Sequence, residues 1–255
     1  MIRTFIRFGR IALVALAAVA VAGPAVAGSN KARSNKVVVE LFTSQGCSSC
    51  PPADAFLRDL SMRDGVIALS FHVDYWNYLG WADPYSSPES TARQRSYRAA
   101  LGVRYVYTPQ MVIGGAAQAV GSNRDDVLKA IAQRSAGAVP GIDIAMSMPK
   151  PGKAKIVIGA GPRPKHAATV WAFLYDRART TEIVRGENEG VRLTNTNVVR
   201  AIHRIGEWNG KRERIRVDLE ELGAASRDAC AIVIQEDGFG PILGADSFPL
   251  PKGSS

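Results

Sequence analysis

Apolar residues near the start of the chain occur in short continuous runs, separated by a stretch with helical spacing. The runs at 37–42 and 66–71 are rich in β-branched residues, which is typical of buried strands. Between them, residues 51–60 place apolar side chains three and four positions apart and confine their prolines to the first turn, which predicts a helix. A strand, a helix and a strand predict a right-handed parallel unit whose strands end at the same edge of a sheet.

The next part of the chain continues to alternate helices and strands. Residues 87–101 predict a second helix, and 106–115 predict a strand that is entered through a proline. Residues 118–120 can pair back as a hairpin strand, and the capping-box pattern at 122–125 predicts a third helix that ends near residue 135. The predicted order is therefore β-α-β-α-β-β-α.

Beyond the small residues at 136–141, the pattern consists of strands alone. Strand-like runs occur at 142–148, 154–158, 168–175, 198–205, 214–219 and 229–235. Short strands at this spacing predict a β-sandwich of about 100 residues. Asn209-Gly210 predicts a hairpin between two of these strands. We therefore expect an α/β domain over residues 36–137 and an all-β domain over 142–250.

Residues 1–27 have the features of a secretory signal peptide. A basic start without acids precedes an apolar run at 11–22, and residues 25–27 provide a small-x-small cleavage site. The apolar run is shorter than the roughly 20 residues that a membrane-spanning helix needs, so we expect no stable membrane anchor. Cleavage leaves a flexible segment at 28–35. Because no twin-arginine pair is present, we expect export through the general secretory route and a periplasmic or secreted protein.

The formal net charge of +9 does not come from a concentrated basic patch. Lysines and arginines are scattered along the chain, and their densest run, at 211–214, already contains an acid. This distribution is typical of a solvated surface, so we expect no nucleic-acid partner.

The three cysteines cannot all pair within one chain, and two of them lie close together in a CxxC motif. Cys47 and Cys50 lie where the first predicted strand gives way to the first predicted helix. The N–H groups and positive dipole end of a helix start stabilise a thiolate, while Ser48 and Ser49 add hydroxyl donors that can contact a substrate. This arrangement predicts Cys47 as the nucleophile and Cys50 as the thiol that resolves a mixed disulfide. Cys230 lies in a predicted buried strand, where a thiol behaves as a small apolar side chain.

A CxxC motif after the first strand, followed by an X-Pro pair that enters a later strand, resembles the thioredoxin superfamily over residues 36–135. The resemblance makes the expected fold an α/β thioredoxin-like domain followed by a C-terminal all-β, sandwich-like domain. It also implies that Pro109 follows a cis peptide bond and lies against the redox pair, with Thr108 facing the substrate. It implies no cofactor.

A longer set of motifs is similar to one group of exported bacterial proteins. The string at 40–54, with those at 72–76 and 80–84, resembles the family named domain of unknown function 1223. The motifs at 186–188 and 197–200 are also similar to that family, so the resemblance extends over essentially the whole mature chain. It implies the fold and leaves the biochemical role open.

Three further side chains are candidates at the sheet edge that carries the cysteines. Glu40 lies one residue further from the first cysteine than the buried acid of thioredoxins. It is either a general base for Cys50 or a carboxylate bonded to backbone or arginine. His72 ends the second strand and is either a ligand or a packed residue. Trp76 either lines a substrate groove or packs under a loop.

Three functions are compatible with these residues, and we favour the first. A thiol-disulfide oxidoreductase would exchange disulfides with protein thiols or small thiols through Cys47. A soft-metal protein would hold Cu(I) through Cys47, Cys50 and His72. A non-catalytic binding protein would use the same disulfide as a local staple.

Overall fold

The structure is a computed structural model that describes residues 1–2, 36–137 and 141–251. The predicted segment 28–35 and all but the first two residues of the predicted signal peptide lie outside the described residues. Within the described ranges, no helix is both long enough and apolar enough to cross a membrane.

Helices and strands alternate in the first half of the described chain. The order is β1 (Val37–Thr43), α1 (Pro51–Ser61), β2 (Val66–His72), the 3₁₀ turn η1 (Asn77–Leu79), α2 (Pro88–Ala100), β3 (Gln110–Ile113), β4 (Ala117–Val120) and α3 (Arg124–Ala136). The second half consists of β5 (Ile144–Lys150), β6 (Lys153–Ile158), β7 (Ala168–Glu182), β8 (Arg192–Trp208), β9 (Glu213–Asp218), the 3₁₀ turn η2 (Ala224–Ser226), β10 (Ala229–Glu236) and β11 (Ile242–Pro249). The predicted β-α-β-α-β-β-α order is confirmed, and β11 is an additional strand.

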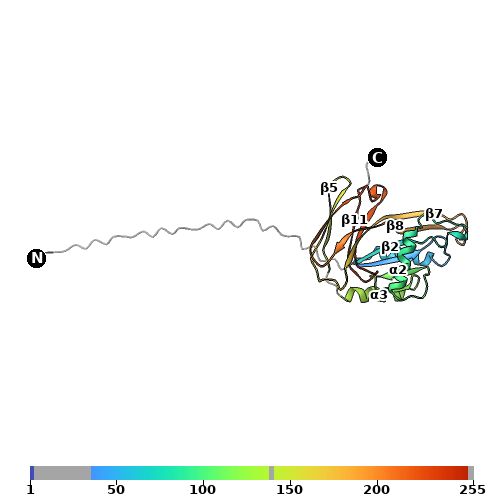
Figure 1. Ribbon diagram of the computed structural model, residues 1–255, viewed down its shortest axis with the longest axis horizontal. Coiled ribbons are helices and arrows are strands. Elements are labelled where there is room, and N and C mark those ends of the chain that lie inside the picture. Colours follow the sequence, from blue (N-terminus) through green and yellow to red (C-terminus); the bar gives the residue numbers. More distant parts are fainter. Residues whose placement is uncertain (3–35, 138–140, 252–255) are drawn as a thin grey trace. The chain divides into compact units, whose positions relative to one another are not determined.

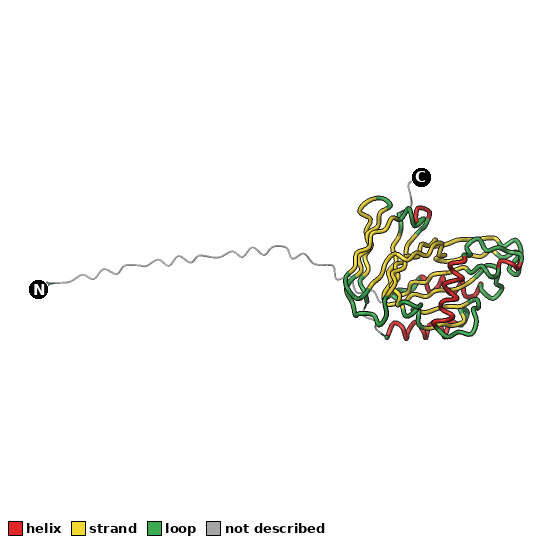
Figure 2. Tube along the Cα trace, in the orientation of Figure 1, coloured by secondary structure: helices red, strands yellow, loops and turns green. Residues whose placement is uncertain are grey.

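The larger of two sheets runs through both halves of the described chain (Figure 1). Its eight strands have the order β11-β10-β7-β8-β2-β1-β3-β4, while β5, β6 and β9 form a three-stranded sheet. Figure 2 shows how strands dominate the arrangement. The expected fold class, an α/β thioredoxin-like domain followed by a separate all-β domain, is therefore wrong. The predicted hairpin at Asn209-Gly210 is also wrong, because β8 and β9 lie in different sheets.

β8 joins β2 through a short ladder that side chains extend. Ser70 pairs with Val198 in parallel register. The Ser70 hydroxyl donates to the carbonyl of Thr196 at 3.0 Å, and Asn197 Nδ2 donates to the carbonyl of Ala68 at 2.8 Å. Asn197 has a φ of 48°, a left-handed conformation that asparagine tolerates better than most residues. A strand at the edge of a sheet leaves backbone N–H and C=O groups without partners. β8 therefore provides partners for backbone groups of β2 that a separate first domain would leave exposed.

Alternate residues of β1 enter two different apolar cores. Val39 and Leu41 lie in a cluster with Phe56 and other side chains of α1 and α3. Phe42 lies in a second cluster that joins α2 to β7 and β10. A third cluster fills the space between the three-stranded sheet and the strands β7 and β10. Because successive side chains on a strand point to opposite faces, the position of a residue in β1 decides which core it enters.

A buried arginine on α2 connects the two halves of the large sheet. Arg93 Nε donates to Glu40 Oε2 at 2.5 Å, and Nη2 donates to Glu40 Oε1 at 3.0 Å and to Gln235 Oε1 on β10 at 3.1 Å. The guanidinium carbon lies within 5.6 Å of the centroids of the rings of Phe71, Tyr97, Trp171, Phe173 and Phe239. A carboxylate and several ring faces thus compensate this buried cation together.

We predict that Arg93→Ala lowers the free energy of unfolding by about 3–5 kcal/mol, because Glu40 is left as an unpaired buried charge. Arg95→Ala is the matched control, since Arg95 is exposed on the same helix, and it should change stability by less than about 0.5 kcal/mol. Urea unfolding measures both variants. If Arg93→Ala costs no more than Arg95→Ala, the buried ion pair does not hold the sheet together.

Candidate functional site

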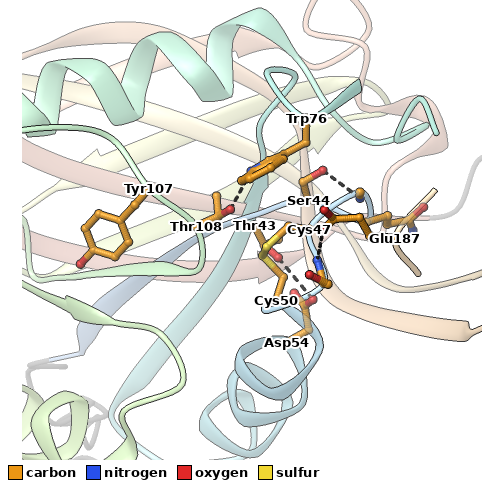
Figure 3. Close-up of a disulfide and its surroundings, with 12 residues drawn as sticks. Thr43, Ser44, Cys47, Cys50, Asp54, Trp76, Tyr107, Thr108 and Glu187 are labelled. Atoms are coloured by element: carbon orange, nitrogen blue, oxygen red, sulfur yellow. Dashed lines mark hydrogen bonds between the residues drawn. A yellow bond between two sulfur atoms is a disulfide. The ribbon is translucent and has the colours of Figure 1, made fainter. Parts of the chain in front are cut away.

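Cys47 and Cys50 form a disulfide in the loop between β1 and α1 (Figure 3). We call residues 44–50 the cysteine loop. Cys47 has 3% of its surface exposed and Cys50 has 0%, whereas Ser48 and Ser49 are exposed. Cys47 is therefore the cysteine nearer to solvent, which is the position expected of an attacking residue.

The helix start beside the disulfide offers fewer hydrogen-bond donors than the sequence pattern predicted. α1 begins with Pro51 and Pro52, which have no backbone N–H. The N–H of Ser48 donates to Glu187 Oε2 at 3.2 Å. Backbone groups therefore stabilise a Cys47 thiolate less than a helix start rich in donors would, and a carboxylate already occupies one nearby donor.

Trp76 and Thr108, the residue before Pro109, lie next to the disulfide. The Thr108–Pro109 peptide bond is cis, as predicted. Trp76 Nε1 donates to Thr108 Oγ1 at 2.7 Å, and both side chains lie beside the cysteines in Figure 3. A side chain at Gly46 would meet the backbone oxygen of Trp76 at 3.3 Å, so glycine lets Trp76 approach the cysteine loop. The structure thus brings together Thr108 and Trp76, two of the four residues predicted to contact a substrate.

The tip of the β7–β8 hairpin, residues 183–191, lies against the cysteine loop. Asn188 Nδ2 donates to the carbonyl of Gln45 at 2.8 Å and to that of Cys47 at 3.0 Å. A side chain at Gly186 would meet Cβ of Trp81 at 3.1 Å, so the tip packs closely on the segment that follows η1. These contacts fix the backbone of the cysteine loop and contribute to the burial of Cys47.

Behind the cysteine loop, His72 and Asp83 form a buried ion pair. His72 Nδ1 lies 2.6 Å from Asp83 Oδ2, which also accepts a hydrogen bond from the N–H of Gln45 at 2.8 Å. Burial alone would lower the pKa of His72, but the charge and hydrogen bond of Asp83 raise it. Burial alone would raise the pKa of Asp83, but the charge of His72 and hydrogen bonds to the carboxylate lower it. The pair is therefore an imidazolium beside a carboxylate.

Asp54 is a buried carboxyl group one helical turn after Cys50. Thr43 Oγ1 donates to Asp54 Oδ2 at 3.3 Å, whereas Asp54 Oδ1 has no hydrogen-bond partner among the described residues. Burial raises the pKa of Asp54 to about 7, although the charge of His72 partly lowers it. This carboxyl group therefore gains and loses its proton in the neutral range, where most aspartates stay ionised.

Glu40, the predicted general base, is directed to the other face of the sheet. It pairs with Arg93 and accepts a hydrogen bond from the Tyr97 hydroxyl at 2.6 Å. On β1, Thr43 faces α1 and Asp54, and Glu40 lies three positions earlier, on the opposite face. The one extra residue before the first cysteine is what turns the side chain away. This geometry matches the alternative interpretation of Glu40, a carboxylate bonded to arginine.

In the part of the chain that the structure describes, no group of three or more His, Cys, Asp and Glu side chains is placed to hold a metal ion. Cys47 and Cys50 are joined to each other, and His72 Nδ1 is bonded to Asp83. The ligand set considered for Cu(I) is therefore not assembled here.

Sequence reasoning did not single out Asp54, Asp83 or Asn188. Asp54 carried a usable signal, because a residue four positions after Cys50 lies on the same helical face. Asn188 carried a weaker one through its place in a family motif. Asp83 lies in the family motif at 80–84, but no local pattern indicated its pairing with His72, because only the folding of a long loop brings the two together.

Comparison with protein families places this arrangement in a known group. Residues 38–235 match the family described as "Protein of unknown function (DUF1223)". The chain belongs to this family. The match to DUF1223 runs from β1 into β10, so it includes the CxxC disulfide, the His72–Asp83 pair and the hairpin tip. The family resemblance stated from the sequence motifs is confirmed.

Two solved structures are similar to this DUF1223 protein. A protein from Agrobacterium tumefaciens, known from an X-ray crystal structure, is 31% identical, with a TM-score of 0.73, and the match covers 86% of this chain and 96% of that chain. HBP35 of Porphyromonas gingivalis has a TM-score of 0.59 at 13% identity and covers 87% of this chain and 78% of that chain, so this likeness is one of fold alone. None of the curated proteins compared with the chain matches it.

The raised pKa of Asp54 predicts a pH-dependent stability difference for Asp54→Asn. Between the ordinary pKa of 3.8 and about 7, the folded protein keeps a proton that the unfolded chain has released, so wild-type stability falls as pH rises. The stability of Asp54→Asn relative to wild type should therefore rise through this window, by at most about 1.4 kcal/mol per pH unit. Urea unfolding of the oxidised protein measures it. Parallel pH curves for the two proteins would show that the folded-state pKa is ordinary.

Asn188→Ala should destabilise the protein by about 1–3 kcal/mol, because the Gln45 carbonyl loses its donor and the Cys47 carbonyl keeps only the N–H of Cys50. It should also speed the reduction of the disulfide by dithiothreitol, since the loop is held less tightly. Glu189→Ala is the matched control on the same hairpin tip, where Glu189 is exposed. Equal reduction rates for the two variants would mean that the tip does not protect Cys47.

Proposed function

We propose that this protein is a thiol-disulfide oxidoreductase that acts through Cys47 and Cys50. The observation that carries the proposal is the disulfide between these cysteines, which lies at a strand-to-helix junction. Trp76 packs on this junction and binds Thr108, whose peptide bond to Pro109 is cis. In the reduced protein, the Cys47 thiolate attacks a substrate disulfide and forms a mixed disulfide, and one substrate thiolate leaves. Cys50 then attacks Cys47, the second substrate thiolate leaves, and the protein disulfide is restored. The substrate gains two electrons and the cysteine pair loses them.

The short loop closed by the disulfide argues against a purely structural role. A cross-link restricts the unfolded chain less as the loop it closes becomes shorter, and this loop joins residues only three apart. The same backbone is already held by Asn188 and by the bond from Gln45 to Asp83. A staple here would add little, whereas a reversible pair next to exposed serines can exchange.

Exposed apolar side chains on the segments around the site favour a protein substrate over a small one. Tyr78 on η1 is 77% exposed, Tyr105 shortly before Thr108 is 65% exposed, and Val184 on the hairpin tip is 62% exposed. Such side chains are suited to contacts with an unfolded or partly folded polypeptide. Export through the secretory route would place the protein in a compartment where such substrates carry disulfides.

Single cysteine variants test the proposal directly. Reduced Cys50→Ser should form a stable glutathione adduct at Cys47 when it is mixed with oxidised glutathione, because no resolving thiol is left. Reduced Cys47→Ser should form far less adduct, since Cys50 is fully buried. Mass spectrometry of both proteins measures the adducts, and a Cys230→Ala background removes the remaining thiol. Equal labelling of the two variants, or a wild-type protein that does not exchange at all, would rule out this mechanism.

A further inference from the structure

A cluster of unpartnered polar atoms lies in the protein interior near Cys50. In the described residues, four buried side-chain nitrogen or oxygen atoms have no hydrogen-bond partner, and three of these belong to Asp54, His72 and Asn195. The charge of His72 acts on the Asp54 carboxyl group, and the Asn195 amide lies near that group without forming a regular hydrogen bond. Buried polar groups are almost always paired, so unpaired atoms on adjacent side chains mark an unusual part of the protein interior.

Asp54 is placed to reach the sulfur of Cys50. The Asp54 N–H donates to the carbonyl of Cys50 at 3.1 Å, so the two residues lie one above the other on α1. Helical side chains lean toward the N-terminus of their helix, which directs the Asp54 carboxyl toward Cys50. Figure 3 shows this carboxyl group beside the disulfide. Cys50 has no exposed surface, so a proton leaving its thiol needs an acceptor inside the protein.

Each element packed around Asp54 contributes a polar or charged group. Thr43 from β1 donates to the carboxyl group. The charge of His72 at the end of β2 lowers the pKa of Asp54, and the charge of Asp83 raises it. Asn195 on β8 also lies beside Asp54. The charge of Arg200, on the same strand, lowers the pKa of His72. Since His72 and Asp83 neutralise each other, Asp54 is the member of the cluster that is free to change its protonation state.

We propose that Asp54 accepts and returns the proton of the Cys50 thiol, and that the His72–Asp83 ion pair is a positioning unit that sets the pH range of this transfer. The inference rests on the proposed exchange function and adds a proton acceptor to it. The acid comes from α1, on the opposite side of the sheet from Glu40.

The proton transfer completes the second step of exchange. The Cys50 S–H bond breaks and its proton passes to the Asp54 carboxylate, while the electron pair stays on the Cys50 sulfur. That sulfur forms a bond to the Cys47 sulfur, and the bond between Cys47 and the substrate sulfur breaks, so that the substrate leaves as a thiolate. Asp54 then returns its proton to the leaving thiolate or to solvent. In the reverse reaction, a substrate thiolate attacks Cys47 of the protein disulfide and the substrate is oxidised. Protonated Asp54 then supplies a proton to the Cys50 thiolate as it leaves.

The imidazolium of His72 keeps the carboxylate form of Asp54 accessible at neutral pH. Without a nearby positive charge, burial would keep Asp54 protonated up to a higher pH. A protonated carboxyl group cannot accept another proton. Removing the charge of His72 should therefore raise the pKa of Asp54 and move proton transfer to higher pH. A shift of proton transfer to higher pH therefore distinguishes an electrostatic role of His72 from a purely structural one.

The test follows the reaction of the reduced, purified protein with oxidised glutathione as a function of pH. Acid quenching and mass spectrometry report the mixed disulfide at Cys47 and its conversion into the Cys47–Cys50 disulfide. In wild type, the conversion should accelerate with a midpoint near the Asp54 pKa of about 7. In Asp54→Asn, the mixed disulfide should accumulate because its conversion is slower by about 10²–10⁴-fold. In His72→Gln, the midpoint should move to higher pH.

Asp59→Asn is the matched control, because Asp59 lies on the same helix in a partly exposed pair with Arg124, and its pH profile should equal that of wild type. An unchanged profile for Asp54→Asn in an enzyme that still exchanges would overturn the proton role and leave the proposed function intact. A wild-type protein that does not exchange would overturn the function itself.

A measurement on the unaltered protein keeps the inference testable if Asp54→Asn does not fold. Carbon NMR of aspartate labelled at its carboxyl carbon should show one resonance that titrates near pH 7 and changes on reduction of the disulfide. A resonance that is the same in the oxidised and reduced proteins would contradict the coupling between Asp54 and Cys50.

Discussion

The attachment of β8 to β2 is the interaction on which the rest of the structure depends. Two side-chain bonds, from Ser70 to the backbone of β8 and from Asn197 to the backbone of β2, extend a short ladder and turn two groups of strands into one sheet. Because β8 is held there, the β7–β8 hairpin reaches the cysteine loop, where Asn188 binds its carbonyls. The second half of the chain is thereby part of the site as well as of the fold.

Local patterns predicted the elements well and their assembly poorly. The order from β1 to α3 followed from periodicity, prolines and caps, all of which act over a few residues. Pairing between β2 and β8 depends on residues more than a hundred positions apart, and no local pattern encodes it. β11 was missed because Gly244, Asp246 and Pro249 are poor strand formers, and its pairing with β10 overrides their preferences.

At the site, the residues that lie together in one motif could be predicted from the sequence. The contacts between residues that are distant in the sequence could not. The Cys47–Cys50 pair followed from its motif, and the cis bond before Pro109 followed from the resemblance to thioredoxins. Glu40 was expected near Cys50, yet strand alternation sends it to the ion pair with Arg93. On the side of the sheet that α1 covers, the buried acid is Asp54, four residues after Cys50. A difference of one residue along β1 determines the face of the sheet on which Glu40 lies, because opposite faces of a strand enter different cores. Glu40 and Asp54 therefore lie on opposite sides of the sheet.

The reduction potential of the Cys47–Cys50 pair distinguishes a disulfide that exchanges from one that only cross-links the chain. Equilibration of the protein in glutathione redox buffers, followed by trapping of free thiols, measures it. We predict a reversible potential between about −120 and −270 mV. It should lie nearer the reducing limit, because the prolines of α1 provide no N–H groups and Glu187 accepts the N–H of Ser48, so the thiolate is less stabilised. A potential below about −300 mV would contradict exchange, since it is typical of structural disulfides.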